Sequence, residues 1–126
     1  MRTHVIINNT DMTPYIVDGS YKIRTEDEYE SWKDGNKIEH RIITSSKVTG
    51  SFDIACSNRA NSITLANFLA ALDAATNNGV LTMGIYVPTT NSLEAINCYY
   101  EKENTEHILS GDGSFIDVLT ITIKER

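Results

Sequence analysis

The segment Asn61–Gly79, NSITLANFLAALDAATNNG, decides the fold, because it alone in the chain has the period of a helix. Its apolar side chains recur three or four residues apart and form one stripe: Leu65, Phe68, Leu69, Leu72 and Thr76. Polar residues occupy the positions between them, so the helix is amphipathic. We expect it to span about residues 61–78, with Asn61 or Ser62 capping its first turn and Gly79 ending it.

The rest of the chain has the alternation of β-strands. Even positions are apolar through most of Ile38–Cys56, and the segment 115–125, FIDVLTITIKE, alternates between apolar and polar residues. With 126 residues and no linker or internal repeat, the chain is predicted to be a single domain, residues 1–126. We predict a mainly β fold, β-sandwich or β-barrel-like, with the helix packed on the sheet.

Two polar stretches are predicted to be extended loops, residues 24–37 and 44–50. The first, RTEDEYESWKDGNK, has too many charges for a core element, so we expect an exposed loop or a hairpin tip, with the tight turn at Asp34-Gly35-Asn36. The second lies between two strands, or within one long bent strand, with a bulge or turn at Thr49–Gly50. A charged loop is also expected at Glu101–His107.

Composition restricts the function. The net charge of −6 and the scattered lysines and arginines argue against nucleic-acid binding. No apolar run is long enough to cross a membrane, and the short apolar stretch at the start does not predict a signal peptide, so we expect synthesis in the cytoplasm. Cys56 and Cys98 fall at inward strand positions, which predicts free buried thiols.

The residues needed for catalysis do not come together in the sequence. Of the three histidines, only His40 is expected to point inward, where we interpret it as a hydrogen-bonded sheet residue. The histidines and cysteines lack the spacing of zinc ligands, and the loop around Asp112 lacks the further oxygen ligands of a calcium site. We therefore predict no enzyme activity, no metal and no cofactor.

An acidic cluster that contains two aromatic residues is the best candidate for a binding surface. Residues 26–30 are mostly acidic, and such a run is either a solvated face or part of a contact with a partner. Tyr29 and Trp32 favour the contact, because aromatic residues are enriched at interfaces. The predicted subunit-interface residues are Glu28, Tyr29, Glu30, Trp32 and Lys47. An exposed Trp32 is also compatible with carbohydrate binding.

Three segments together resemble a known class of proteins. They are DMTPYI at 11–16 followed by GSYK at 19–22, GSFDI at 50–54, and LTITIKER at 119–126. In this order they resemble small tail proteins of long-tailed bacteriophages and of prophages of Gram-positive bacteria. Tail-tube, tail-completion and distal-tail proteins of this class have a β-sandwich flanked by a helix, and a long hairpin or loop that reaches a neighbouring subunit.

The resemblance implies a virion structural protein of the tail or tail tip, made in the bacterial host cytoplasm. Copies of the chain would form a homo-oligomeric ring in contact with neighbouring tail proteins, with Arg24–Lys37 and Thr44–Thr49 as the inter-subunit arms. No membrane and no specific nucleic acid is expected as a partner, and the class supplies no catalytic or ligand residues to carry over. An alternative is a monomeric phage-encoded inhibitor of a host defence protein, whose acidic cluster at Glu26–Glu30 would mimic nucleic acid.

Overall fold

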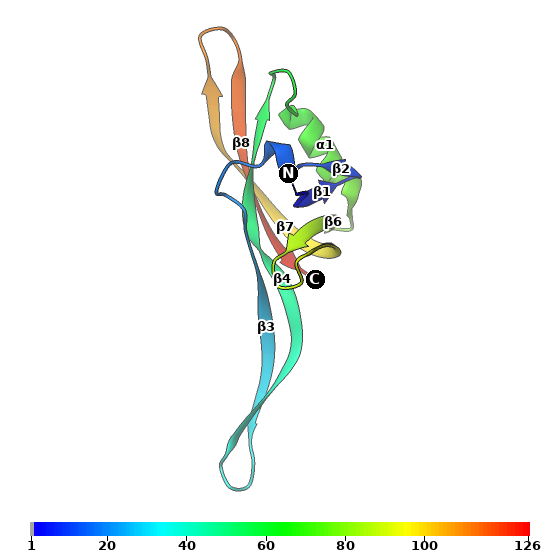
Figure 1. Cartoon of the computed structure of the whole chain (residues 1–126), viewed down its shortest axis with the longest axis vertical. Coiled ribbons are helices and arrows are strands. Elements are labelled where there is room, and N and C mark those ends of the chain that lie inside the picture. Colours follow the sequence, from blue (N-terminus) through cyan, green and yellow to red (C-terminus); the bar gives the residue numbers. More distant parts are fainter. Residues whose placement is uncertain (1) are drawn as a thin grey trace.

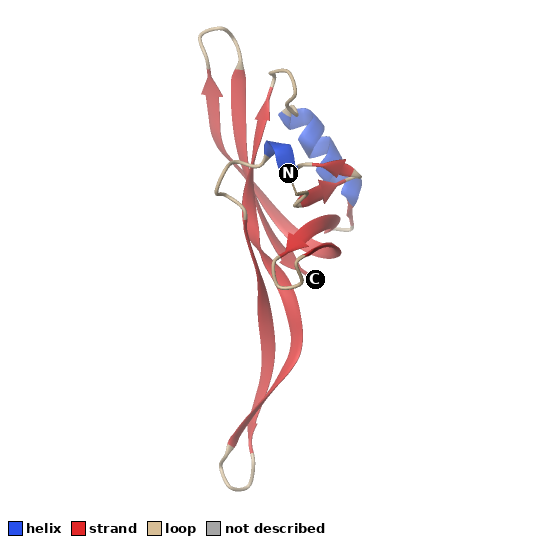
Figure 2. Ribbon diagram, in the orientation of Figure 1, coloured by secondary structure: helices blue, strands red, loops and turns tan. Residues whose placement is uncertain are grey.

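The fold is one large antiparallel sheet with a short helix packed on it (Figures 1 and 2). A computed structural model describes residues 2–126, without the side chains of residues 28 and 43–45. The strands are β1 (Val5–Ile7), β2 (Thr10–Asp11), β3 (Lys22–Lys33), β4 (Glu39–Ser57), β5 (Thr76–Asn77), β6 (Val80–Val87), β7 (Ser92–Leu109) and β8 (Phe115–Glu125). The helices are α1 (Leu65–Ala75) and the 3₁₀ turn η1 (Thr13–Tyr15). The predicted mainly β class with one packed helix is confirmed.

The strand order is β2-β1-β6-β7-β8-β4-β3, with the short β5 paired to β6. The sheet is open and strongly curved, so that β3 at one end approaches β6 near the other. The Tyr21 hydroxyl donates to the Tyr86 carbonyl over 2.6 Å, and the hydroxyls of Thr25 and Thr89 lie 2.7 Å apart. The curvature encloses the core within a single sheet.

Helix α1 covers this core with the predicted stripe. Phe68 and Leu72 are fully buried, and Leu65 and Leu69 pack on the core from its margin. Their partners are the inward side chains of the strands, which are Val5, Ile7, Val48, Phe52, Ile54, Cys56, Leu81, Met83, Ile85, Val87, Ile96, Cys98, Leu119, Ile121 and Ile123, together with Met12. The strand alternation thus identified the buried face.

The predicted ends of the helix are wrong. Thr64 is the N-cap, because its hydroxyl accepts from the Asn67 backbone N–H over 3.2 Å, and Asn61 instead adopts a left-handed turn conformation. At the other end the chain leaves the helix at Thr76 and enters β5. Gly79 closes the tight turn between β5 and β6, where its φ is +79°.

The predicted loops at 24–37 and 44–50 are mostly strand. Residues 24–33 belong to β3 and residues 44–50 to a single nineteen-residue β4, while the turn at Asp34–Asn36 is present. Pairing continues through Gly50, so no turn interrupts β4 there. The charged segment Glu101–His107 likewise continues β7. A strand can carry charged side chains on both faces when both faces meet water. Such a strand has no alternation between apolar and polar residues, so the sequence pattern does not identify it.

Both cysteines are buried and free, as predicted. Burial raises the pKa of Cys56 to about 11 and that of Cys98 to about 12. Neither thiol is therefore a nucleophile at neutral pH.

Candidate assembly surface

The β3–β4 hairpin extends far beyond the core (Figure 1). Strand β8 pairs with β4 only from Thr49 to Ser57, whereas β3 pairs with β4 along the whole hairpin. Glu26–Lys47 is consequently a two-stranded ribbon, which we call the arm. No core side chain comes from the part of the arm that the structure describes, and its strand residues 26–33 and 39–42, where described, are exposed.

The turn of the arm is held by Asp34. Its backbone N–H donates to the Ile38 carbonyl, and one carboxylate oxygen accepts from the backbone N–H groups of Asn36 and Ile38 over 2.8 and 3.1 Å. The other carboxylate oxygen lies 2.9 Å from His40 Nε2. The hydrogen bond from His40, followed by those from the backbone, lowers the pKa of Asp34.

The two faces of the arm differ. On one face Trp32 stacks on His40 with ring centroids 5.4 Å apart, and Glu30 lies opposite Ile42. On the other, the Arg41 guanidinium lies 5.5 Å from the centre of the Tyr29 ring. Trp32 is half-exposed, at 50 %, and Tyr29 at 55 %. Each face thus presents one large aromatic side chain to solvent.

Four of the five predicted interface residues have described side chains. Tyr29, Glu30 and Trp32 are exposed on the arm, with Tyr29 on the face opposite the other two. Lys47 is half-buried at the base of the arm, opposite Glu26. The side chain of Glu28 lies outside the described residues.

The prediction of an inward His40 is wrong. Within residues 2–126, no element covers the arm, so a side chain of inward parity there meets water, and His40 is exposed. Ile38 and Ile42 share this parity. The alternation assigned them to the buried face, but both are more than half exposed.

Exposed large apolar side chains gather on two hairpins. Among the described residues there are eight, of which four lie on the arm and three on the outer part of β7; they are Tyr29, Trp32, Ile38, Ile42, Tyr99, Ile108, Leu109 and, elsewhere, Leu93. Leu109 is the most exposed of them, at 68 %.

The β7–β8 hairpin, Cys98–Glu125, points away from the arm (Figure 1). Its turn is fastened to the end of β4: Asn58 Oδ1 accepts from the Phe115 backbone N–H over 3.0 Å, and Arg59 Nη2 donates to Ser114 Oγ over 3.1 Å. Further along, Asp117 is almost fully buried and bonds to the ring of His107. On one side of this hairpin β8 pairs with β4, whereas on the other side the edge of β7 beyond Cys98 is exposed.

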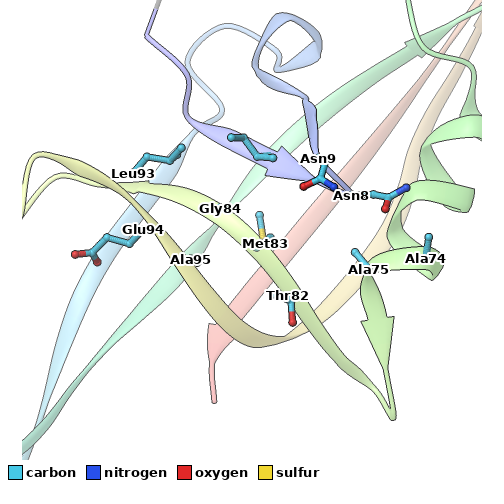
Figure 3. A pocket seen from close by; sticks show the side chains of 11 residues that line it. Asn8, Asn9, Ala74, Ala75, Thr82, Met83, Gly84, Leu93, Glu94 and Ala95 are labelled. Atoms are coloured by element: carbon cyan, nitrogen blue, oxygen red, sulfur yellow. The ribbon is translucent and has the colours of Figure 1, made fainter.

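A shallow open hollow of about 600 Å³ lies where the end of α1 meets the outer side of β1, β6 and β7 (Figure 3). Its walls are mainly small or apolar, with Ala75, Gly84 and Leu93 among them, and Glu94 is its one ionisable side chain. Among these lining residues, no nucleophile lies beside a histidine or a lysine that could act as its base.

Two further searches cover the described part of the chain. No three His, Cys, Asp or Glu side chains there converge as they would around a metal ion. Within the same residues, no helix has the length and apolar character needed to cross a membrane.

Comparison with protein-family models gives no match, and comparisons with curated proteins and with solved structures give none either.

Proposed function

We propose that the protein is a structural component of a bacteriophage tail or tail tip and assembles with copies of itself into a ring. The arm is the observation that carries the proposal. It extends from a well-packed core, lacks a covering layer in the described chain, and exposes Tyr29, Trp32 and Ile42 to solvent.

A two-stranded ribbon gains little stability alone in water. Its unpaired backbone groups and apolar side chains are instead suited to pairing with another chain. Stable interfaces bury on the order of 800 Å² per partner, which a ribbon with two exposed faces and half-exposed aromatic residues can supply. The arm is therefore the natural contact between subunits.

The rest of the proposal follows from that role. The protein would be made in the bacterial host cytoplasm and incorporated into the virion tail, where it meets neighbouring tail proteins. It would act by assembly and not by catalysis, without a cofactor, and neither a membrane nor a specific nucleic-acid sequence would be its partner.

The inhibitor alternative has less support from the arrangement of charges. Glu26 pairs with Arg24 over 2.6 Å, and Asp27 accepts a hydrogen bond from Ser46. Arg41 lies on the opposite strand of the same ribbon. Two of the acidic residues thus have basic or neutral partners, and the acidic strand lies beside a strand with Lys37, Arg41 and Lys47 before and within it, unlike the uniform negative charge of nucleic acid.

Light scattering across a concentration series, followed by negative-stain imaging, tests the proposal. We expect rings or tubes from the intact chain. A variant in which Asn-Gly replaces residues 28–45 joins Asp27 to Ser46 by a two-residue hairpin turn and leaves every described core residue in place. It should fold and remain monomeric.

A milder pair of changes, Tyr29→Ala with Trp32→Ala, should weaken assembly without abolishing folding. Leu93→Ala is the matched control, because Leu93 is an exposed apolar residue outside both hairpins. An intact chain that stays monomeric at every concentration, or an arm-shortened chain that still forms rings, would contradict the proposal.

A further inference from the structure

The two edges of the arm differ in charge. The β3 edge, residues 26–33, contains four carboxylates and one lysine in its sequence. The β4 edge, residues 37–47 with the end of the turn, contains Lys37, Arg41 and Lys47 against one carboxylate, Glu39. One ribbon therefore offers an acidic edge and a basic edge to other chains.

A third exposed edge lies on the β7–β8 hairpin. Strand β6 pairs with β7 only as far as Cys98, and β8 covers the other side of β7 up to Leu109. In the described chain, β7 beyond Cys98 thus has no strand on its outer side. Residues 101–109 are all exposed, and residues 99–109 contain three glutamates and one lysine.

These edges match in length as well as in charge. The β4 edge from Glu39 to Lys47 has nine residues, and the outer β7 edge from Tyr99 to Leu109 has eleven. Each edge also borders exposed apolar side chains, Ile42 on the arm and Tyr99, Ile108 and Leu109 on β7. Pairing of strands would bring both sets out of water together.

We propose that the β4 edge of the arm adds as a strand to the outer β7 edge of a second copy of this chain. This inference rests on the proposed function and names the two surfaces that meet. The basic β4 edge suits the acidic β7 edge, whereas the β3 edge would set carboxylates against carboxylates. At the base of the arm, the Thr25 hydroxyl of β3 also lies 2.7 Å from the hydroxyl of Thr89, in the turn that follows β6 of the same chain.

The position of the two edges explains why such a contact repeats. They lie at opposite ends of the long axis of the molecule (Figure 1). Because the edges are different surfaces, each copy that uses its arm on one neighbour leaves its β7 edge for another. A contact of this kind propagates until it closes into a ring or continues as a helical stack.

Charge reversal tests the pairing. We expect Arg41→Glu and Glu103→Arg, each alone, to raise the concentration at half-assembly by about tenfold, measured by light scattering at low salt. A chain carrying both reversals restores opposite charges and should return to within about threefold of wild type. Lys22→Glu and Asp73→Lys are controls, since they change net charge equally on exposed residues away from both edges.

Each outcome of this experiment supports or overturns the proposed pairing of β4 with β7. Single variants that assemble like wild type would overturn the inference while leaving the proposed function standing. Weakened single variants without recovery in the double variant would also overturn it, because the two charges would then act at separate places. If the wild-type chain does not assemble at all, the inference and the proposed function fail together.

Discussion

The two long hairpins of this molecule have similar lengths but are held in different ways. In the β7–β8 hairpin, β8 has a neighbour on each edge for most of its length, and Asn58 and Arg59 fasten the turn to the end of β4. In the arm, β4 beyond Thr49 pairs with β3 alone, and the bonds of Asp34 hold the turn at its far end. The first hairpin contributes Leu119, Ile121 and Ile123 to the core, and the second contributes no described core residue from Glu26–Lys47.

The difference shows that a third strand decides what a hairpin does. Where β8 lies beside β4, alternate side chains become core. Where β8 ends, the same strand β4 continues with the same alternation but its apolar residues meet water. The Glu125 carboxylate marks this point, because it accepts from the Val48 backbone N–H over 2.9 Å just where β4 leaves the sheet.

The largest effect is expected from Gly50→Ala, which acts at the root of the arm. Gly50 has a φ of +151°, and a Cβ there would lie 2.0 Å from the Lys22 carbonyl oxygen of the paired strand. The substitution should force β3 away from β4 and lower the free energy of unfolding by about 3 kcal/mol, measured by urea denaturation.

Gly35→Ala is the matched control, because its added methyl group would meet open space in the turn of the arm. It should change the free energy of unfolding by no more than about 0.5 kcal/mol. Equal stabilities for the two variants would show that the root of the arm is not constrained as described.

An intermediate effect is expected when the fastened hairpin is released. Asn58→Ala removes the acceptor of the Phe115 N–H and should lower the free energy of unfolding by about 1 kcal/mol. Asn36→Ala, in the turn of the arm, should leave stability nearly unchanged, because no described bond ties that turn to the rest of the molecule. Comparable losses from both variants in thermal and urea unfolding would remove the contrast between the hairpins.

The smallest effect concerns the two turn carboxylates. His40→Ala should raise the pKa of Asp34 toward its ordinary value of 3.8, because the hydrogen bond from His40 is the main cause of its lowering. The lowered pKa of Asp112 depends first on Ser114 and should not move. Carboxyl carbon titration by NMR measures both groups in one sample.

The sign of the pH dependence follows from these lowered values. A carboxyl group with a lowered pKa in the folded state stabilises it above the unfolded pKa, and this contribution is lost as the pH falls through the folded pKa. Acidification below about pH 4 should therefore loosen the turn of the arm in the intact protein, and less so in His40→Ala. An Asp34 midpoint that is the same with and without His40 would contradict this account.

Much of the fold could be predicted from local pattern. The stripe from Leu65 to Leu72 identified the helix and its buried face, and alternation in residues 115–125 identified β8. The ends of the helix could not be predicted in the same way. Three residues could cap the helix: Asn61, Ser62 and Thr64. The Ser57 backbone N–H, at the end of β4, donates to the Ile63 carbonyl and fixes the chain just before Thr64, so Thr64 is the N-cap.

The candidate surface was predicted in part. Tyr29 and Trp32 were chosen because aromatic residues are enriched at interfaces, and both side chains are exposed. Ile42 was missed because it has the parity of Phe52 and Ile54 on β4, and Ile38, just before β4, continues that parity. Ile108 and Leu109 were missed because nothing in their own sequence shows that β6 begins only at Val80 and so pairs with β7 no further than Cys98.

By itself, the sequence determined the period of each element, the side chains able to form a core, and the turn at Asp34–Asn36, because these depend on neighbours a few residues away. Only the tertiary structure decided which edges remain unpaired and which apolar residues face water. Those properties depend on where strands distant in the chain begin and end beside one another. In β4 that boundary lies at Thr49, and it separates a core strand from an arm.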